Sequence, residues 1–276
     1  MPPVVRGLIF ASVIAFFGQS ALMPQESMNL LALHIWGAAN FAPYQILTHM
    51  FMHANLAHLF FNMLALYMFG SILEVVWGAR RFLTYYLVTG IGAAFLYMAT
   101  AYIELRPTLQ ATDSFWEQPA PDNIDALNQS EYIQMSIAFS CVEQPEGAIC
   151  VGADTFFQNL AILSETPEDR RTSNQVAAYL SEIRPYILDV HRAVGASGAI
   201  FGLLLAFGVL FPNQILRIYF VVPIKAKYFV VLYGALELYM GLRNSPGDNV
   251  AHFAHLGGML FGIILLYQWG YLRRRK

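Results

Sequence analysis

Charged side chains are scarce in this chain. They make up 12% of its 276 residues, whereas hydrophobic residues make up 57%. This balance is too apolar for a soluble domain of this length and is typical of a protein that crosses a membrane several times. Lysine is absent from residues 104–191, where fourteen Asp and Glu accompany four Arg. This acidic segment has no basic surface, so we expect no nucleic-acid partner.

Cysteine is nearly absent as well. The two cysteines, Cys141 and Cys150, both lie in the acidic segment, with Pro145 and Gly147 between them. They do not have the CxxC spacing of a metal site, and we expect no metal or cofactor. On the outer side of a membrane, an oxidising compartment would permit a disulfide between them. Two free thiols buried in a small core are the alternative.

Six apolar runs have about the length that crosses a bilayer, roughly 17 to 25 residues. They are residues 8–23, 56–77, 82–103, 193–211, 228–242 and 250–271. The first run lacks a small-residue cleavage site, so we interpret it as a retained helix rather than a signal peptide. Without a repeated block or a heptad pattern, the sequence predicts one all-α polytopic bundle of six transmembrane helices. The predicted parts are 1–103 (spans one to three with the first outer loop), 104–191 (an insertion) and 192–276 (spans four to six with a basic tail).

The basic residues predict how the bundle is oriented. Ten of the sixteen Lys and Arg lie at the termini or in the second and fourth connections, on one face of the membrane. They are Arg6, Arg80, Arg81, Arg217, Lys225, Lys227, Arg273, Arg274, Arg275 and Lys276. By the positive-inside rule this face is cytoplasmic. We therefore expect a multi-pass protein of a bacterial inner membrane, with both termini cytoplasmic and the insertion outside.

The insertion has two parts. From Arg106 to about Ser173 it is rich in Pro, Asn, Asp and Gln, which predicts short helices and loops. Apolar residues then recur at helical spacing up to residue 192. We expect a helix there, capped by Ser173 or Asn174 and kinked at Pro185.

A serine and a histidine lie in apolar, glycine-containing helices near the end of the chain. Ser197 belongs to the motif GASG at 195–198, and His255 to AHLGG at 254–258. Small residues at Gly198 and Gly258, each repeated four positions later, allow two helices to approach closely. Close approach permits a hydrogen bond from Ser197 to His255, as nucleophilic catalysis requires. Either motif alone is more simply explained by helix packing.

A third polar cluster strengthens the functional interpretation. His53, His58 and Asn62 lie at the outer end of the second run, and His58 and Asn62 share a helix face through their i, i+4 spacing. Complementary polar side chains at the outer ends of spans two, four and six are hard to explain as packing. Together they indicate peptide-bond hydrolysis within the membrane.

These three motifs resemble those of the rhomboid intramembrane serine proteases: THMFMHANLAHLFFN at 48–62, GASG at 195–198 and AHLGG at 254–258. The resemblance covers all six spans and leaves the insertion outside it. It implies that Ser197 is the nucleophile, that His255 is the general base, and that His58 and Asn62 complete an oxyanion hole. Gly195, Gly198 and Gly258 match the family's motif positions, and transmembrane proteins in the lipid bilayer are the implied substrates.

Two positions depart from the pattern of some family members. Phe201 replaces a tyrosine that stacks on the histidine, so stacking remains while a hydrogen bond is lost. Tyr44 and Gln45 stand where a Trp-Arg pair is found, so contacts with lipid headgroups in the first outer loop will differ.

Three further ionisable residues need an interpretation. His252 is the rival base, but Gly258 and Gly262 follow His255 in the family register, and we place His252 near the aqueous rim. We expect Glu74 to pair with Arg80 or Arg81 at the membrane interface. Glu237 lies in the short fifth run, which resembles the family's lateral substrate gate, and has no assigned role.

Two other functions remain alternatives. A catalytically inactive rhomboid-like protein would bind membrane clients, but such relatives usually lack the serine or the histidine. A small transporter would show paired broken helices in related halves, and the sequence has no such pattern.

Overall fold

The computed structural model describes residues 1–22, 24–117, 120–218, 222–243 and 251–272. The chain is mostly helical and forms two compact units. Unit 1 comprises residues 1–33, 42–99 and 193–276, and unit 2 comprises residues 34–41 and 100–192. The short strands β1 (Leu33–His34) and β2 (Arg192–Ala193) pair with each other.

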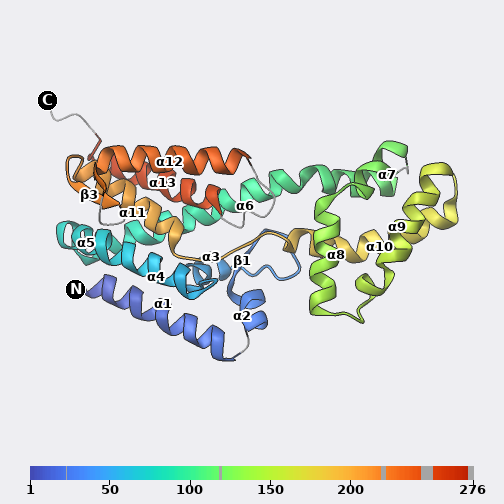
Figure 1. Cartoon of the computed structure of the whole chain (residues 1–276), viewed down its shortest axis with the longest axis horizontal. Helices are drawn as coiled ribbons and strands as arrows, with labels where there is room; N and C mark the ends of the chain where they lie inside the picture. The colour runs from blue at the N-terminus through green and yellow to red at the C-terminus, as the bar shows by residue number, and fades with distance from the viewer. Residues whose placement is uncertain (23, 118–119, 219–221, 244–250, 273–276) are drawn as a thin grey trace. The chain divides into compact units, whose positions relative to one another are not determined.

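Unit 1 contains most of the apolar helices. They are α1 (Pro3–Leu22), α2 (Pro24–Leu31), α3 (Gln45–Thr48), η1 (His49–Phe51), α4 (Leu56–Ala65), the π-helical turn η2 (Leu66–Gly70), α5 (Ser71–Trp77), the first part of α6 (Ala79–Glu117), α11 (Ser197–Leu210), α12 (Ala226–Arg243) and α13 (His252–Gln268). Within this unit α11 contacts both α12 and α13 (Figure 1). Strands β3 (Ile215–Ile218) and β4 (Val222–Lys225) form an antiparallel hairpin, with Ile215 opposite Lys225.

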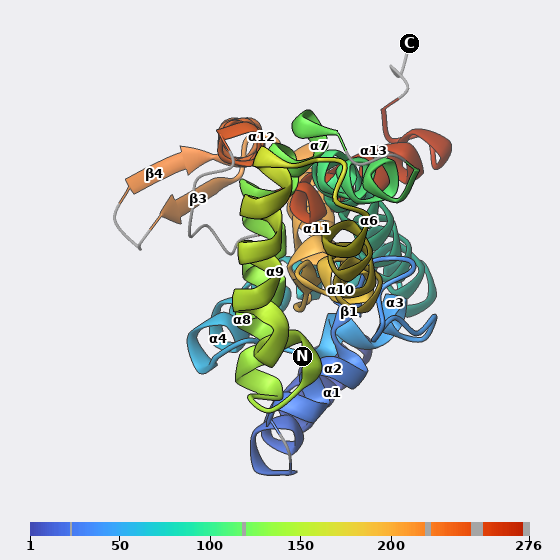
Figure 2. The same ribbon diagram turned by 90° about the vertical axis from the view of Figure 1, so that its right-hand side faces the viewer.

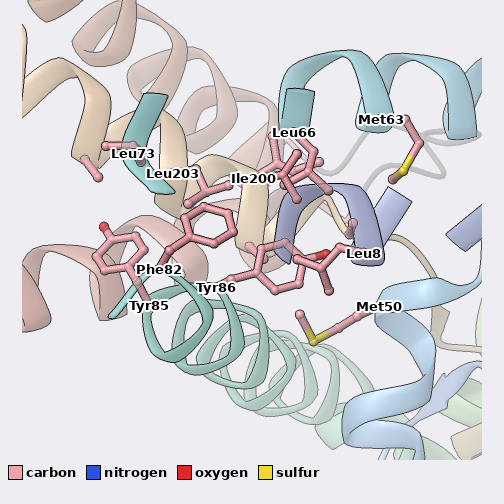
Figure 3. Packing of buried hydrophobic residues seen from close by; sticks show 14 of the residues in the cluster. Leu8, Met50, Met63, Leu66, Leu73, Phe82, Tyr85, Tyr86, Ile200 and Leu203 are labelled. Carbon is pink, nitrogen blue, oxygen red and sulfur yellow. The ribbon is translucent and has the colours of Figure 1, made fainter. Parts of the chain in front are cut away.

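The core of unit 1 lies between α6 and α11. Phe82, Tyr85 and Tyr86 of α6 are fully buried and face Ile200 and Leu203 of α11 (Figure 3). The Tyr85 hydroxyl donates a hydrogen bond to the carbonyl oxygen of residue 202 at 2.9 Å. A buried aromatic side chain therefore has its polar end satisfied, as a core requires.

Three helices among the described residues are long and apolar enough to cross a membrane: Pro3–Ala21, Leu56–Trp77 and Ala79–Trp116. Two shorter apolar helices, Ser197–Leu210 and His252–Gln268, match the fourth and sixth predicted spans. The fifth predicted span corresponds to α12. The number of six spans stays a prediction.

Helix α6 differs from the sequence-based expectation. The short helices and loops were expected from Arg106 onward, but up to Glu117 the structure has one continuous helix with Pro107 inside it, and shorter helices follow only after that residue. A proline removes one backbone donor, and the neighbouring turns keep their own hydrogen bonds. An apolar helix can thus extend past a proline when the rest of its sequence favours it.

The expected ion pair of Glu74 with Arg80 or Arg81 is wrong. The carboxylate is 3% exposed and accepts the backbone N–H groups of Val4 at 2.9 Å and Val5 at 2.8 Å. These amides belong to the first turn of α1, where N–H groups have no intrahelical partner and the helix dipole is positive. Glu74 therefore caps α1 from a different helix.

Replacing Glu74 by Gln should destabilise the protein by about 1 to 3 kcal/mol. The side-chain oxygen of Gln can accept one of the two backbone N–H groups, but its NH₂ group is itself a donor and would face the other N–H. The measurement is the apparent melting temperature in detergent. Glu26→Gln is the matched control, since Glu26 is an exposed carboxyl group in the first turn of the next helix, α2. Equal melting temperatures for the two variants would contradict this capping role.

Unit 2 is a small helical assembly. Besides the second part of α6, it contains α7 (Pro121–Asn128), α8 (Glu131–Glu143), α9 (Ala148–Glu165) and α10 (Arg170–Asp189). Helices α8, α9 and α10 contact one another (Figure 2). Asp189 at the end of α10 holds the His34 ring, with 2.9 Å between carboxylate oxygen and Nδ1.

The start of α10 lies before the predicted cap. Asp169, not Ser173 or Asn174, is the cap, and its carboxylate accepts the backbone N–H of Arg171 at 3.0 Å and the hydroxyl of Thr172 at 2.7 Å. These bonds, chiefly those from Thr172, lower the pKa of Asp169. Pro185 lies inside this helix.

Unit 2 contains the disulfide Cys141–Cys150, which joins α8 to α9. Protein prepared without reductant should show no thiol that reacts with an alkylating reagent, as measured by intact mass. Replacing both cysteines by alanine should destabilise unit 2 by about 2 to 3 kcal/mol, the value expected for a closed loop of this size. Two alkylated thiols in unreduced protein would contradict the pairing.

Candidate active site

Helix α11 begins at Ser197, directly after a tight turn. Gly195 in this turn has a φ of +122°, which side chains with a Cβ rarely adopt. Its backbone N–H donates to the carbonyl oxygen of His49 at 2.9 Å. The turn is thereby held against η1, and Ser197 lies beside the unpaired N–H groups of a helix N-terminus.

Helices α11 and α13 touch through their backbones. A Cβ atom on Gly258 would overlap the carbonyl oxygen of Gly198. A Cβ on Gly198 would overlap the side chain of Ala93 on α6. Gly258 is needed for the approach of α13 to α11, and Gly198 for the approach of α11 to α6, which together bring the starts of α11 and α13 close.

Ser197 and His255 are within hydrogen-bonding distance. Serine Oγ and histidine Nε2 are 2.8 Å apart, and His255 is 9% exposed. The ring of Phe201 stacks on the imidazole with centroids 4.2 Å apart and an interplanar angle of 6°. Phe201 therefore restricts the ring's rotation while Nε2 faces the hydroxyl. This arrangement can transfer a proton from the hydroxyl to the imidazole.

His58 and Asn62 lie on the other side of the turn. A Cβ atom built on Gly195 would lie 2.8 Å from His58 Nε2 and 3.7 Å from Asn62 Nδ2. Asn62 is 6% exposed, and its Nδ2 has no hydrogen-bond partner among the described residues. A buried donor without a partner is costly in the resting protein. The arrangement suits a negative charge that forms beside Ser197 only during a reaction.

The tautomer of His58 follows from its neighbours. The backbone N–H of Ala54 donates to His58 Nδ1 at 3.4 Å, so the neutral ring carries its proton on Nε2. Asn55 caps α4 by accepting the backbone N–H of His58 at 2.8 Å. The Nε2–H group is thus a donor directed toward Gly195.

The remaining histidines of this region have supporting positions. His53 is fully buried and packs its ring against His58, with centroids 5.2 Å apart. His49 donates a hydrogen bond from Nδ1 to the carbonyl oxygen of Gln45, 2.8 Å away. Burial lowers the pKa of His49 to about 4, so this ring is neutral at pH 7. Neither ring faces Ser197 in the way that His255 does.

The departure at Tyr44 and Gln45 has a clear structural outcome. Gln45 is fully buried, and its amide donates to the carbonyl oxygens of Asn29 and Leu30 at 3.2 and 3.1 Å. Tyr44 is half exposed. Gln45 therefore ties the first loop to the end of α2 instead of facing lipid headgroups.

His252 does not lie at the aqueous rim as expected. It is 6% exposed, and its Nδ1 is 2.7 Å from Glu237 Oε2. The same oxygen is 2.8 Å from Nδ1 of His255. Glu237, which received no role from the sequence, therefore contacts the histidine that faces Ser197. The sequence did contain one indication of this role, the charge of Glu237, because an ionisable residue inside an apolar helix needs a polar partner.

Glu237, His252 and His255 are also the described residues that could hold a metal ion. Their ligand atoms lie within 4.8 Å of one another. Two imidazoles and a carboxylate are ligands that zinc accepts. Both rings lie at hydrogen-bonding distance from one oxygen of Glu237, so the observed geometry is that of hydrogen bonds within the protein.

A small cavity lies behind the serine. Its volume is about 20 Å³, and its lining includes Ser197, Gly198, His49 and Tyr97. A space of this size, with polar groups in its wall, holds about one water molecule.

Comparisons with known proteins agree on one family. A sequence model of the Rhomboid domain matches residues 40–104 and 174–273, more than half of the chain. An uncharacterized mitochondrial rhomboid protein of Schizosaccharomyces pombe is 26% identical over 226 residues. The alignment covers 80% of this chain and 49% of the yeast protein, so the chain spans about half the length of this curated relative. The Rhomboid match includes most of α10 and leaves residues 105–173 outside.

Proposed function

The chain belongs to the rhomboid family, and from this premise we propose that it is an intramembrane serine protease that uses Ser197 and His255 as a catalytic pair. The observation that carries the proposal is the 2.8 Å separation of Ser197 Oγ from His255 Nε2. Nucleophile and base lie within direct proton-transfer distance at the start of an apolar helix. No metal or cofactor enters the proposed reaction.

The first half of the reaction forms an acyl-enzyme. Ser197 Oγ attacks the carbonyl carbon of the peptide bond while its proton passes to His255 Nε2. The carbonyl oxygen becomes negatively charged and accepts hydrogen bonds from Asn62 Nδ2, His58 Nε2 and the backbone N–H of Ser197. The intermediate then collapses, the C–N bond breaks, and His255 gives its proton to the departing amine.

The second half uses water. His255, again neutral, takes a proton from a water molecule, whose oxygen attacks the ester carbon. The same oxyanion donors stabilise the second intermediate. Its collapse passes the proton from His255 back to Ser197 Oγ and releases the new carboxyl group, which then loses its remaining proton to water. The small cavity beside Ser197 lies in a suitable place to store such a water molecule.

The proposed substrates are transmembrane segments of other proteins. A helix in lipid satisfies its carbonyl groups internally, so a cleavable segment must be locally unwound. We propose that it enters sideways at α12, which carries exposed apolar side chains including Val231, Leu232 and Leu242. Bilayer contact accounts for such exposure.

The proposed orientation places the basic end of unit 1 on the cytoplasmic side of a bacterial inner membrane. Side-chain contacts hold this end together: Glu74 binds the start of α1, and Trp77 and Arg81 contact Trp269 after α13. Tryptophan and arginine are common at membrane interfaces. Ser197 lies at the opposite end of α11 from Leu210, so the reaction would occur nearer the outer surface.

A catalytically inactive family member is the alternative. Labelling with a serine-directed fluorophosphonate decides between them, because the probe reacts only with an activated serine. The protease proposal expects labelling of the wild type, no labelling of Ser197→Ala, and cleavage of an artificial transmembrane substrate by the wild type alone. Folded wild-type protein that is neither labelled nor active would support the inactive alternative.

A further inference from the structure

The carboxylate of Glu237 occupies an unusual position for a residue of an apolar helix. It is 4% exposed, and one of its oxygens, Oε2, lies 2.8 Å from His255 Nδ1 and 2.7 Å from His252 Nδ1. The other nitrogen of His255 faces Ser197 Oγ at 2.8 Å. Serine, imidazole and carboxylate therefore form one continuous hydrogen-bonded chain. Helices α11, α13 and α12 each supply one member.

We propose that Glu237 is a positioning residue that makes the catalytic unit of this protein a Ser197–His255–Glu237 triad. The inference rests on the proposed function and adds a third residue to it. Glu237 acts through the imidazole and does not touch the substrate. His252 has a secondary role, since its N–H group holds the same carboxylate oxygen in place.

The first contribution of Glu237 is to select a tautomer. A neutral histidine carries one proton, on either Nδ1 or Nε2. A carboxylate can only accept hydrogen bonds, so it requires the proton of His255 to be on Nδ1. Nε2 then has a free electron pair directed at the serine hydroxyl. Without the carboxylate, the ring could instead carry its proton on Nε2, and it would then be unable to act as a base.

The second contribution is electrostatic and arises during the reaction. When Ser197 transfers its proton, His255 becomes positively charged in a site that is largely closed to water. A carboxylate 2.8 Å from Nδ1 attracts this charge, and such attraction is stronger in a buried site than in water. The interaction is stronger in the transition state than in the resting state, which is the condition for accelerating the chemical step.

A purely structural role is the competing explanation. In that case Glu237 would only tie α12 to α13, and removing it would weaken the fold without a specific effect on the chemical step. The free energy needed to bury the charge of Glu237 argues against this explanation. A neutral side-chain amide could link the two helices with a smaller desolvation penalty. A buried carboxylate on the histidine of the site is more costly than stability alone requires.

The test compares Glu237→Gln, Glu237→Asp and wild type for cleavage of an artificial transmembrane substrate in detergent. Glu237→Gln keeps the size of the side chain and removes its charge. We expect its kcat to fall about 10²- to 10⁴-fold, up to the loss typical of neutralising the carboxylate of a serine-histidine-carboxylate triad, with KM nearly unchanged. Glu237→Asp keeps the charge on a shorter side chain and should recover part of the rate.

Glu74→Gln is the matched control. Glu74 is also a buried carboxylate of unit 1, and it accepts two N–H groups from α1 rather than from the site. This variant should melt at a lower temperature and keep the wild-type kcat. The comparison separates loss of a buried carboxylate from loss of the third triad member.

Each outcome decides the matter. Glu237→Gln with the wild-type kcat, or an aspartate variant no better than the glutamine variant, overturns the inference and leaves the proposed function intact. If Glu237→Gln does not fold, a folded Glu237→Asp variant with a lowered kcat and a nearly unchanged KM supports the inference, and one with the wild-type kcat overturns it. Wild-type protein without labelling or cleavage overturns the proposed function, and the inference with it.

Discussion

Ser197→Ala and His255→Ala proteins are each expected to cleave an artificial transmembrane substrate at least about 10⁴-fold more slowly than the wild type, because members of one catalytic unit fail together. Neither change should unfold the bundle, since the helices α11 and α13 meet through glycine backbones and not through these two side chains. Turnover by purified protein in detergent, together with melting temperature, measures both parts of this prediction.

His252→Ala is the control for the assignment of the base. It removes a neighbouring buried histidine on the same helix and leaves His255 facing Ser197. Measurable activity is expected, with a reduction that reflects looser placement of Glu237. An inactive His252→Ala protein beside an active His255→Ala protein would mean that the base has been assigned to the wrong residue.

Asn62→Ala is expected to lower kcat by about 10² to 10³ with little change in KM, because an oxyanion donor acts mainly in the transition state. His58→Ala should have an effect in the same direction. The measurement is steady-state cleavage over a range of substrate concentrations. Residual activity is expected in both variants, since the backbone N–H of Ser197 remains.

Asn159→Ala in α9 of unit 2 is the matched control for Asn62. Asn159 is also a buried asparagine, and its amide donates to Gln175 at 3.3 Å, outside the candidate site. This variant should keep the wild-type kcat. A change in KM alone for Asn62→Ala would assign Asn62 to substrate binding and not to the oxyanion.

The residues around Ser197 could be predicted from sequence because glycine, serine and histidine occur there at informative spacing. Gly198 and Gly258 indicated where two helices touch, and the structure has their backbones in contact. His58 and Asn62 could be placed on one face because the helical period relates positions four residues apart. These are local or pairwise signals, and the catalytic roles attached to them stay predictions.

The partners of Glu237 and Glu74 could not be predicted in this way. Nearly all other residues of their helices are apolar, so hydrophobic periodicity does not show which face meets a neighbour. Glu74 was expected to pair with nearby arginines, yet it binds amides of Val4 and Val5 about seventy residues away. Long-range pairing depends on how the helices are rotated, and a single apolar sequence leaves this rotation undetermined.

The insertion was harder to predict for a different reason. Pro107 and the polar composition favoured a break, whereas α6 continues to Glu117. For α10, Asp169 precedes the serine and asparagine that were expected to cap it, and the first suitable acceptor begins the helix. Local propensities compete over a few residues, so boundaries are less certain than the presence of the helices.

The three helices of the site are joined by links of unequal stiffness. The main chains of α11 and α13 meet where Gly198 and Gly258 touch, so the backbones that carry Ser197 and His255, whose side chains lie 2.8 Å apart, are held at a fixed separation. Helix α12, in contrast, reaches the imidazole through the flexible side chain of Glu237. A substrate that pushes α12 outward would first lengthen this contact between Glu237 and His255. The contact between Ser197 and His255 would be kept. Wider opening for the substrate would therefore lower the basicity of His255. A bulky substrate would then react with a weaker base than a slender one.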